Sequence, residues 1–273
     1  MCITLFFYRH DLCKVSRAFG MMHYLHLNNM KQFLFCVLLA VCSLQLSAQT
    51  IQLLDSGKTT SIRGLSVVND NIVWVSGANG MVGRSIDGGA SFKWNKVDGF
   101  AKTDFRDIEA FDANTAIIMG IDTPAVILKT IDGGISWKIV FQDKRPGMFL
   151  DAMEFFNEKS GVVLGDPING KIFMAVTVDG GATWRPIPES LAPAAEKGEA
   201  MFASSGTNVR TVGKQELLFI TGGTYSRIFI RNDKIVLPII QGKETTGANS
   251  LAVWDKKTFA IVGGDFNNAT SIE

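Results

Sequence analysis

Three near-copies of one eight-residue pattern constrain this chain more than any other feature of its sequence. The copies read SIDGGASF, TIDGGISW and TVDGGATW, and their aspartates, Asp87, Asp132 and Asp179, lie 45 and 47 residues apart. Two strand-like segments joined by a glycine-containing turn precede each copy, and a further short strand-like segment follows it. Four short strands in about 45 residues, without helical periodicity, are typical of a β-propeller blade.

The fixed residue types of the pattern have a local structural explanation. The aspartate can accept hydrogen bonds from its own turn, the glycines allow a positive φ, and the serine or threonine can close the far side of the turn. The aromatic residue can then pack between neighbouring sheets. A calcium site needs roughly six to eight oxygen ligands, which one carboxylate per turn cannot supply. We therefore expect no metal site and interpret the following residues as structural: Asp87, Gly89, Phe92, Asp132, Gly134, Trp137, Asp179, Gly181 and Trp184.

The pattern is similar to the Asp-box, also called the bacterial neuraminidase (BNR) repeat, of sialidase-like propellers. The succession of Asp-box, short strand and the segments DIEAF or DAMEFF looks more like the propellers related to the photosystem II stability and assembly factor. This resemblance covers residues 50–273. It implies an all-β fold and a binding surface more than an activity, because many bacterial proteins of that group are secreted and have no established role.

Five repeated units can be placed along the chain, at about residues 58–100, 101–146, 147–190, 198–243 and 244–273. The turn of the fourth unit lacks the glycines, and the fifth unit ends just after its second predicted strand. A propeller closes by packing its first blade against its last. We therefore predict that residues 49–273 form a C-terminally incomplete β-propeller of about four and a half blades, with about six or seven blades and a monomeric state if complete.

The first 48 residues differ from the rest. From Met30, a lysine is followed by an apolar run over residues 33–44 and by a small-residue cleavage site after Ala48. This order is typical of a secretory signal peptide. The run of 12 residues is shorter than the roughly 20 that span a bilayer, so we expect no stable membrane span after cleavage. The sequence thus predicts export to the periplasm or the extracellular space, with residues 1–29 as an upstream extension.

Cleavage would leave a chain of restricted chemistry. All four cysteines and all three histidines lie within residues 1–48. The remainder therefore has no thiolate nucleophile, disulfide, Cys/His zinc site or histidine base. The removed segment holds four of the 27 basic and one of the 26 acidic residues, so 23 and 25 remain, a net charge of −2. That balance predicts no preference for nucleic acid, and no dinucleotide-binding fingerprint indicates a cofactor.

Charged residues recur at matching places on the predicted innermost strands. Alignment of the units on their Asp-boxes places Arg63 opposite Arg106, and it places Asp107 opposite Asp151. The innermost strands line the central channel of a propeller, and the loops between strands form its funnel. These residues either pair with one another as inter-blade salt bridges or form a charged funnel that binds a polar ligand.

Further charged residues extend this set. Glu109 and Glu154 lie a little further along the innermost strands, while Asp166, Arg227 and Asp265 occur at corresponding ends of predicted second strands. The candidate ligand-binding residues are Arg63, Arg106, Asp107, Glu109, Asp151, Asp166, Arg227 and Asp265. We assign no catalytic residue.

Two classes of function remain open, of which we favour the first. The first is an exported binding or assembly module that recognises an unknown protein or glycan partner, or another polar ligand, through its funnel without catalysis. The second is a sialidase-like glycan-processing enzyme, since Arg63 precedes the first Asp-box, where sialidases place an arginine. The chain reads SIRG there instead of the family's FRIP, and Tyr225 is the sole tyrosine after residue 48. The resemblance implies that the family's nucleophilic tyrosine would fall in the missing C-terminal blades. A third alternative, an oxidoreductase, would need a cofactor without a visible site.

Overall fold

The computed structural model describes residues 51–203, 206–213, 216–255 and 257–268. The chain divides into two units, and every described strand lies in the unit that contains Leu54–Glu273. Among the described residues, none belongs to a helix that is long and apolar enough to cross a membrane. The predicted signal peptide and the extension before it lie outside the described residues.

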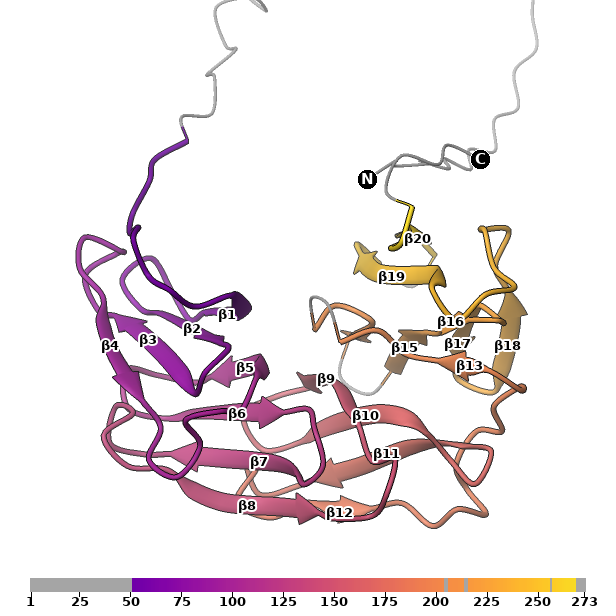
Figure 1. Ribbon diagram of the computed structural model, residues 1–273, viewed down its shortest axis with the longest axis horizontal. Coiled ribbons are helices and arrows are strands. Elements are labelled where there is room, and N and C mark those ends of the chain that lie inside the picture. Colours follow the sequence, from indigo (N-terminus) through magenta and orange to yellow (C-terminus); the bar gives the residue numbers. More distant parts are fainter. Residues whose placement is uncertain (1–50, 204–205, 214–215, 256, 269–273) are drawn as a thin grey trace, which may run out of the picture. The chain divides into compact units, whose positions relative to one another are not determined.

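The strands form five antiparallel sheets of four strands each. The first three sheets are meanders in chain order (Figure 1). The first contains β1 (Ile62–Val67), β2 (Val73–Gly77), β3 (Met81–Ser85) and β4 (Lys93–Lys96). The second contains β5 (Phe105–Ala110), β6 (Ala116–Gly120), β7 (Ala125–Thr130) and β8 (Lys138–Asp143). The third contains β9 (Leu150–Phe155), β10 (Gly161–Ile168), β11 (Lys171–Thr177) and β12 (Arg185–Pro186). These sheets confirm the predicted all-β fold of four-stranded blades.

The last two sheets are interleaved along the chain. The fourth contains β14 (Val209–Val212), β15 (Glu216–Ile220), β17 (Arg227–Ile230) and β18 (Asp233–Val236). The fifth contains β13 (Glu199–Ala200), β16 (Gly222–Gly223), β19 (Thr246–Val253) and β20 (Phe259–Asp265). Two short strands from within the fourth predicted unit therefore belong to the fifth sheet, where β16 meets β19 through Gly222 and Gly247.

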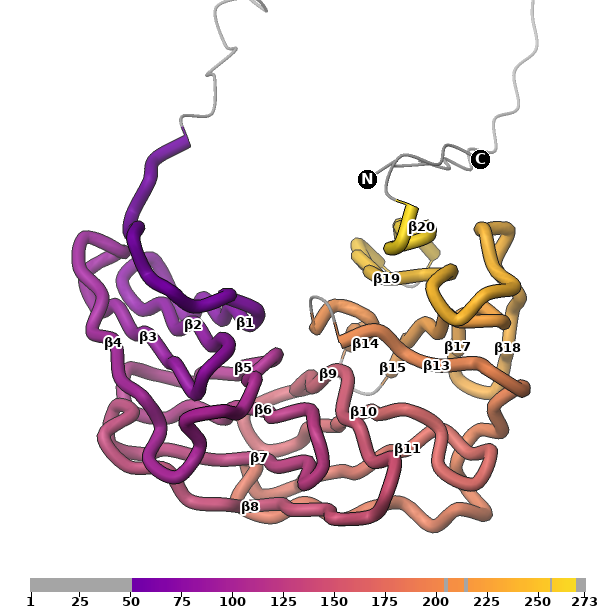
Figure 2. The backbone as a smooth tube through the Cα atoms, viewed as in Figure 1, coloured from indigo at the N-terminus to yellow at the C-terminus, as the bar shows by residue number. Residues whose placement is uncertain are grey.

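Each sheet packs against the next through its first long strand, and the core lies between the sheets. The contacts run from β1 to β5, from β5 to β9, from β9 to β14 and from β14 to β19, so these are the innermost strands (Figure 2). Apolar clusters fill the spaces between successive sheets, as where Trp74 of β2 meets Phe105 and Ile118. Burial of one such large side chain stabilises the fold by roughly 2–3 kcal/mol.

The Asp-box turn of the second sheet is held by its aspartate. One carboxylate oxygen of Asp132 accepts hydrogen bonds from the hydroxyl of Thr130 at 2.8 Å and from the amide of Ser136 at 3.0 Å. The other accepts the hydroxyl of Ser136 at 2.5 Å. Gly133 and Gly134 have φ values of 76° and 80°, a region that side chains disfavour. Every fixed residue type of the turn is thereby accounted for without a ligand.

The other two Asp-boxes form the same bonds, which changes the acidity of all three aspartates. The hydroxyl four residues after each aspartate is the largest cause, followed by the amide of the same residue. Because these donors stabilise the charged form, the pKa falls to about 2 in Asp87, Asp132 and Asp179.

The aromatic residue of each Asp-box completes the packing between sheets. The ring of Trp137 meets Trp74 of the first sheet edge-on, with ring centroids 6.4 Å apart. Trp184 is buried in the cluster between the second and third sheets. Phe92 instead packs against Trp94 of its own sheet, with ring centroids 6.0 Å apart, since no sheet precedes the first among the described residues. The Asp-box thus joins neighbouring sheets as well as closing a hairpin.

Candidate functional site

The innermost strands share a bulge, which sets where their polar side chains lie. In β1, β5 and β9 the pairing with the second strand slips by one residue, and the extra residue is Arg63, Arg106 and Asp151, respectively. A bulge of this kind turns the extra side chain toward the side of its successor. Asp151 therefore corresponds to Arg106, and Asp107 corresponds to Ala152. Alignment on the Asp-boxes had instead placed Asp151 opposite Asp107, which is wrong.

A second set of equivalent positions lies further along the same strands. Three residues after each bulge come Ser66, Glu109 and Glu154. On β14, the amide of Ile220 donates to the carbonyl of Asn208, which places Asn208 at the level of Asp107. Arg210, two residues later, therefore stands beside Glu154 as Glu154 stands beside Glu109.

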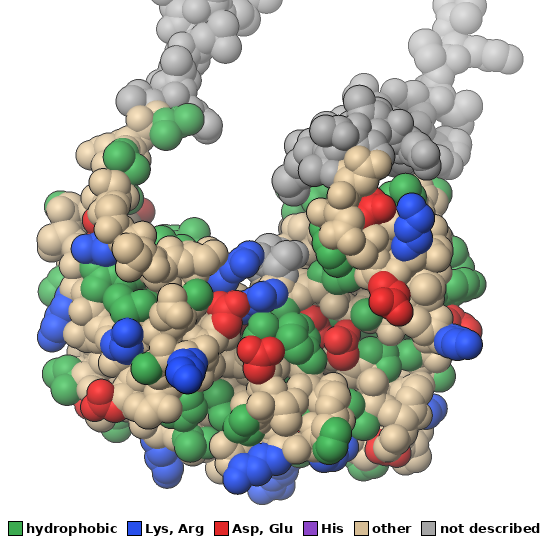
Figure 3. Space-filling model, in the orientation of Figure 1, with side chains coloured by type: hydrophobic (Ala, Val, Ile, Leu, Met, Phe, Trp, Pro, Cys, Tyr) green, Lys and Arg blue, Asp and Glu red, His purple; other side chains and the backbone are tan. Residues whose placement is uncertain are grey.

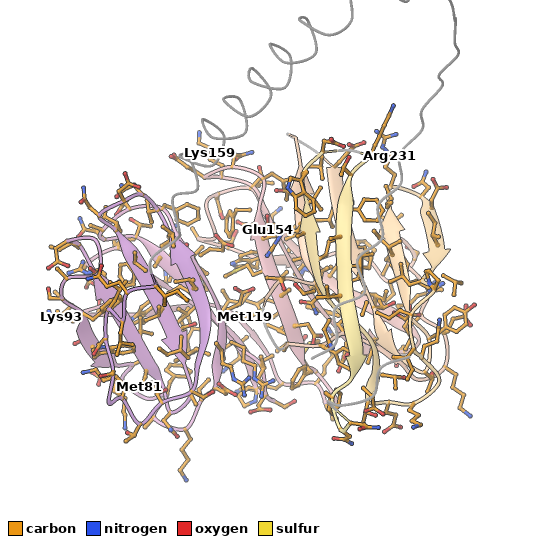
Figure 4. The ribbon with its side chains drawn as sticks, turned by 90° about the horizontal axis from the view of Figure 1, so that it is seen from above. Met81, Lys93, Met119, Glu154, Lys159 and Arg231 are labelled. Carbon is orange, nitrogen blue, oxygen red and sulfur yellow. The ribbon has the colours of Figure 1, made fainter. Side chains whose placement is uncertain are left out.

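We call the polar side chains of these innermost strands the inner wall. It consists of Arg63, Ser66, Arg106, Asp107, Glu109, Asp151, Glu154 and Arg210. In the view of Figure 3, acidic and basic side chains gather over the innermost strands. Figure 4 shows Glu154 between the sheets, whereas Lys93 lies at the outer edge of the first sheet.

Glu154 and Arg210 form the one ion pair between innermost strands among the described residues that lie beyond the bulges. The guanidinium Nη1 lies 3.2 Å from Oε2 of Glu154, and Oε1 accepts the hydroxyl of Thr211 at 3.3 Å. Burial raises the pKa of Glu154, and Arg210 opposes that rise. The pair links β9 to β14, and the guanidinium of Arg210 is thereby already bound to a carboxylate.

Glu109 has no such partner. It is half-buried, and it makes no hydrogen bond or ion pair with any described residue. Burial raises its pKa well above the usual value, and the nearby carboxyls of Asp107 and Glu154 add to the rise, while Arg210 opposes it. Glu109 is thus a hydrogen-bond acceptor on the inner wall that the fold does not use.

Asp107 is buried and ties the second sheet to the third. Its carboxylate accepts the amide of Met153 on β9 at 2.7 Å and its neighbour's amide, of Ile108, at 2.9 Å. Burial raises the pKa of Asp107 to about 7, although both amides favour the charged form. This residue is mainly structural, but its charge acts on Glu109.

At the level of the bulges, Arg106 is paired and Asp151 is not. Arg106 donates through Nε to Asp104 at 2.9 Å and through Nη1 to the carbonyl of Ala203 at 3.2 Å. Asp151 is 0% exposed, and neither carboxylate oxygen has a well-formed hydrogen bond from a described residue. Burial, followed by the charge of Asp166, raises its pKa well above the usual value; Arg106 and the amides of Ala203 and Asp166 oppose this only in part.

The remaining predicted residues near these strands are partly used by the fold. Asp166, on the second strand β10, accepts the amide of Met201 at 2.9 Å, and burial raises its pKa. Arg63 is half-buried, and its Nε has no hydrogen-bond partner. Arg63 is the bulge residue of β1, as Arg106 and Asp151 are of β5 and β9, and the charge of Asp166 acts on Asp151.

Arg227 and Asp265 lie in other surroundings. Arg227 is on β17, the third strand of its sheet, and not at a second-strand end as predicted. Its guanidinium is 6% exposed and forms a paired contact with Glu199, through Nε at 2.9 Å and Nη2 at 2.5 Å. Asp265 ends β20, where hydrogen bonds from Thr245 and the amide of Asn267 lower its pKa. Neither residue joins the inner wall.

Sequence alignment missed Arg210 as a member of the site. The fourth unit lacks a complete Asp-box, so no fixed residue was available from which to count to its innermost strand. The hydrogen bond from Ile220 to Asn208 supplies that register instead.

No protein-family model matches the chain, and no curated protein matches it. Among solved structures, the chain is similar to YCF48 bound to D1 peptide, with a TM-score of 0.50 and 18% identity over 79% of this chain and 64% of that chain. A GH74 enzyme from Niastella koreensis gives a TM-score of 0.43 and 17% identity over 62% of this chain and 28% of that chain. YCF48 from Cyanidioschyzon merolae gives 0.32 and 12% over 78% of this chain and 95% of that chain.

These likenesses concern the fold. The likeness to YCF48 at a TM-score of 0.50 confirms the predicted propeller fold and its resemblance to propellers related to the photosystem II assembly factor. The chain spans less than two thirds of the length of the YCF48 structure that holds the D1 peptide. Identities below 20% leave the chemistry of the site to be argued from the inner wall itself.

Proposed function

We propose that this chain is a binding module that recognises a polar ligand or a protein partner through its inner wall, without catalysing a reaction. The observation that carries the proposal is the surplus of polar groups there. The Nε atom of Arg63 and both carboxylate oxygens of Asp151 are buried without a well-formed hydrogen bond to a described residue, whereas buried polar groups in folded proteins are nearly always satisfied. Side chains that the fold leaves unsatisfied are available to a ligand.

The comparison supports a protein partner as one kind of ligand. YCF48, whose fold this chain resembles, is described as bound to a D1 peptide. A propeller of this fold can therefore hold a segment of another protein. The identity of the segment does not transfer at 18% identity.

Photo-crosslinking from the inner wall tests this proposal without assuming the charge of the ligand. Arg63 is replaced by p-benzoylphenylalanine in the full chain, which is irradiated in extracts of the producing cells. The control carries the same group at Lys93, which is exposed on the outer strand β4 (Figure 4). We expect one discrete covalent adduct, identified by mass spectrometry, from position 63 and none of the same mass from position 93. Equal adducts from both positions, or none from position 63, contradict the proposal.

We also propose that the chain is exported. The support is the signal-peptide pattern between Met30 and Ala48. N-terminal sequencing of the protein from the periplasmic or culture fraction should begin at Gln49. A chain that keeps residues 30–48 and stays with the cytoplasm would exclude export.

A further inference from the structure

The inner wall has an excess of carboxyl groups over guanidinium groups. Its three arginines are Arg63, Arg106 and Arg210, and its four acids are Asp107, Glu109, Asp151 and Glu154. Two of the arginines are already engaged, Arg106 by Asp104 and Arg210 by Glu154. The carboxyl groups of the inner wall that have no ion-pair partner therefore outnumber its unpaired guanidinium groups.

The unsatisfied groups are mostly acceptors. Glu109 occupies the position on β5 that corresponds to Ser66 on β1 and Glu154 on β9, and no described residue donates a hydrogen bond to it. The hydroxyl oxygen of Ser66 accepts the amide of Ala110 at 3.0 Å, and Ser66 forms no hydrogen bond with Glu109. In its ionised form the carboxylate of Glu109 accepts hydrogen bonds and donates none, so the group that completes its hydrogen bonds in that form is a donor.

Asp151 gives a second, independent indication of the same kind. Both of its oxygens are fully buried and lack a well-formed hydrogen bond from a described residue. It stands three residues before Glu154 on β9, and the bulge turns it to the same side of the strand. A buried acceptor without a donor costs about 1–3 kcal/mol, a cost that a bound donor would remove.

This inference rests on the proposed function and names the chemistry of its ligand. We propose that the inner wall binds a cationic group, the ammonium or guanidinium of a lysine or arginine side chain on a protein partner, with Glu109 and Glu154 as its acceptors. Among the described residues, no group of three or more His, Cys, Asp or Glu side chains is close enough to hold a metal ion. A long side chain that carries its own donors fits separated acceptors better than a divalent ion does.

Binding of a cation should release protons. Burial holds the pKa of Glu109 above its usual value, with Asp107 on its own strand and Glu154 on β9 adding to this. Arg210 on β14 opposes the rise, and Arg63 is the charged group of the inner wall on β1. A cation beside Glu109 favours the charged form and lowers the pKa, so affinity should increase as pH rises.

Isothermal titration calorimetry of the full chain with an end-blocked tetralysine peptide tests the inference. Tetraglutamate of equal length is the probe of opposite charge, and spermine is a free amine of similar charge. We expect tetralysine to bind, more tightly at pH 8 than at pH 6, with proton release seen as a dependence of the heat on the buffer. Glu109→Gln should weaken binding by about tenfold, which corresponds to about 1.4 kcal/mol. Glu158→Gln, which changes an exposed carboxylate in the β9–β10 turn, should leave affinity unchanged.

The outcomes separate this inference from the proposed function. Tetraglutamate binding in place of tetralysine overturns the cationic ligand but leaves a binding module. Equal affinity of the wild type and Glu109→Gln for tetralysine overturns the assigned acceptors, provided that circular dichroism shows both to be folded. Tighter binding of spermine than of tetralysine overturns the protein side chain as the source of the cation. If no probe binds, the inference is wrong, while crosslinking from position 63 still decides the proposed function.

Discussion

The Asp-box turns and the inner wall use the same residue type in opposite ways. Asp132, in an exposed turn, accepts hydrogen bonds on both oxygens, and its pKa falls to about 2. Asp107 and Asp151, buried on innermost strands, have raised pKa values because burial outweighs the partners they have. The Asp-box aspartates thus stabilise the fold in their charged form, whereas Asp107 and Asp151 are buried at a cost to that form.

Side chains that keep unused hydrogen-bonding capacity are the ones that can bind a ligand. A group whose hydrogen bonds are complete within its own hairpin has nothing left to offer a ligand. Groups that the fold leaves incomplete persist against a free-energy cost, and such sites are where function is expected to oppose stability. In this chain they are on the inner wall, and Asp151 is the clearest case because both of its oxygens are buried without a well-formed hydrogen bond.

The greatest loss of stability is expected at Arg227, and a much smaller loss is expected at Arg63, although the sequence placed both among the ligand-binding candidates. Arg227→Ala removes the partner of Glu199, which is 4% exposed, and an uncompensated buried charge costs about 3–5 kcal/mol. Arg63→Ala removes a half-buried side chain whose Nε has no partner, and we expect a cost below about 1 kcal/mol. Urea unfolding of both variants measures this. If Arg63→Ala costs as much as Arg227→Ala, the inner wall is part of the structural framework and the comparison fails.

The second prediction concerns pH, where the two regions should act in opposite directions. The unfolded chain releases the proton of Asp107 near pH 3.8, whereas the folded chain keeps it to about pH 7. The folded state therefore binds more protons in this interval, and stability falls as pH rises, by up to about 4 kcal/mol. The Asp-box aspartates, with pKa values of about 2, contribute stability above pH 3.8 that is lost as pH falls toward 2.

Asp107→Asn and Asp132→Asn test which residues cause these two opposite pH dependences of stability. The slope of the free energy of unfolding between pH 4 and pH 7, from urea titrations, should flatten in Asp107→Asn and remain in Asp132→Asn. The slope is compared rather than the absolute stability, because asparagine also loses an acceptor for one of the amides of Met153 and Ile108. A wild-type chain that gains stability from pH 4 to pH 7 would contradict the raised pKa.

The fold could be predicted because its signal is local and repeated. Within the Asp-box, Thr130, Asp132 and Ser136 are close in sequence and bond to one another, so the pattern can be recognised without knowledge of distant contacts. Repetition at blade spacing then indicates the propeller. Trp137 reaches another sheet, but its position at the end of each copy marks it as a packing residue.

The site could be predicted only in outline because its geometry depends on long-range register. The distance from the bulge residue to the Asp-box differs between units, being 24 residues from Arg63 to Asp87, 26 from Arg106 to Asp132 and 28 from Asp151 to Asp179. Counting from the Asp-box therefore does not give the register, and Asp151 was matched to Asp107 instead of Arg106. Arg227 was placed with the ligand-binding residues because its partner, Glu199, lies 28 residues away. Arg210 had no Asp-box from which to be counted.

The smallest of the three effects tests whether an Asp-box glycine serves the turn alone or also the joint between sheets. Gly181 has a φ of 73°, and an added Cβ would lie 2.2 Å from Cδ1 of Ile117 in the second sheet. Gly170, in the β10–β11 turn, has a φ of 70° and no atom within 4 Å of such a Cβ. Alanine at either position adds conformational strain of about 1 kcal/mol, and overpacking against Ile117 should bring the cost at Gly181 to about 2–3 kcal/mol.

A double-mutant cycle isolates the contact between the two sheets. Ile117→Val alone should cost about 1 kcal/mol, because it leaves a small cavity in the core. In the Gly181→Ala background the same change removes the methyl group that the new Cβ meets, so it should restore stability instead of reducing it. Additive costs in urea unfolding would mean that the Asp-box acts within its own hairpin only. If Ile117→Val stabilises the Gly181→Ala variant, the neighbouring sheet as well as the turn requires glycine at position 181.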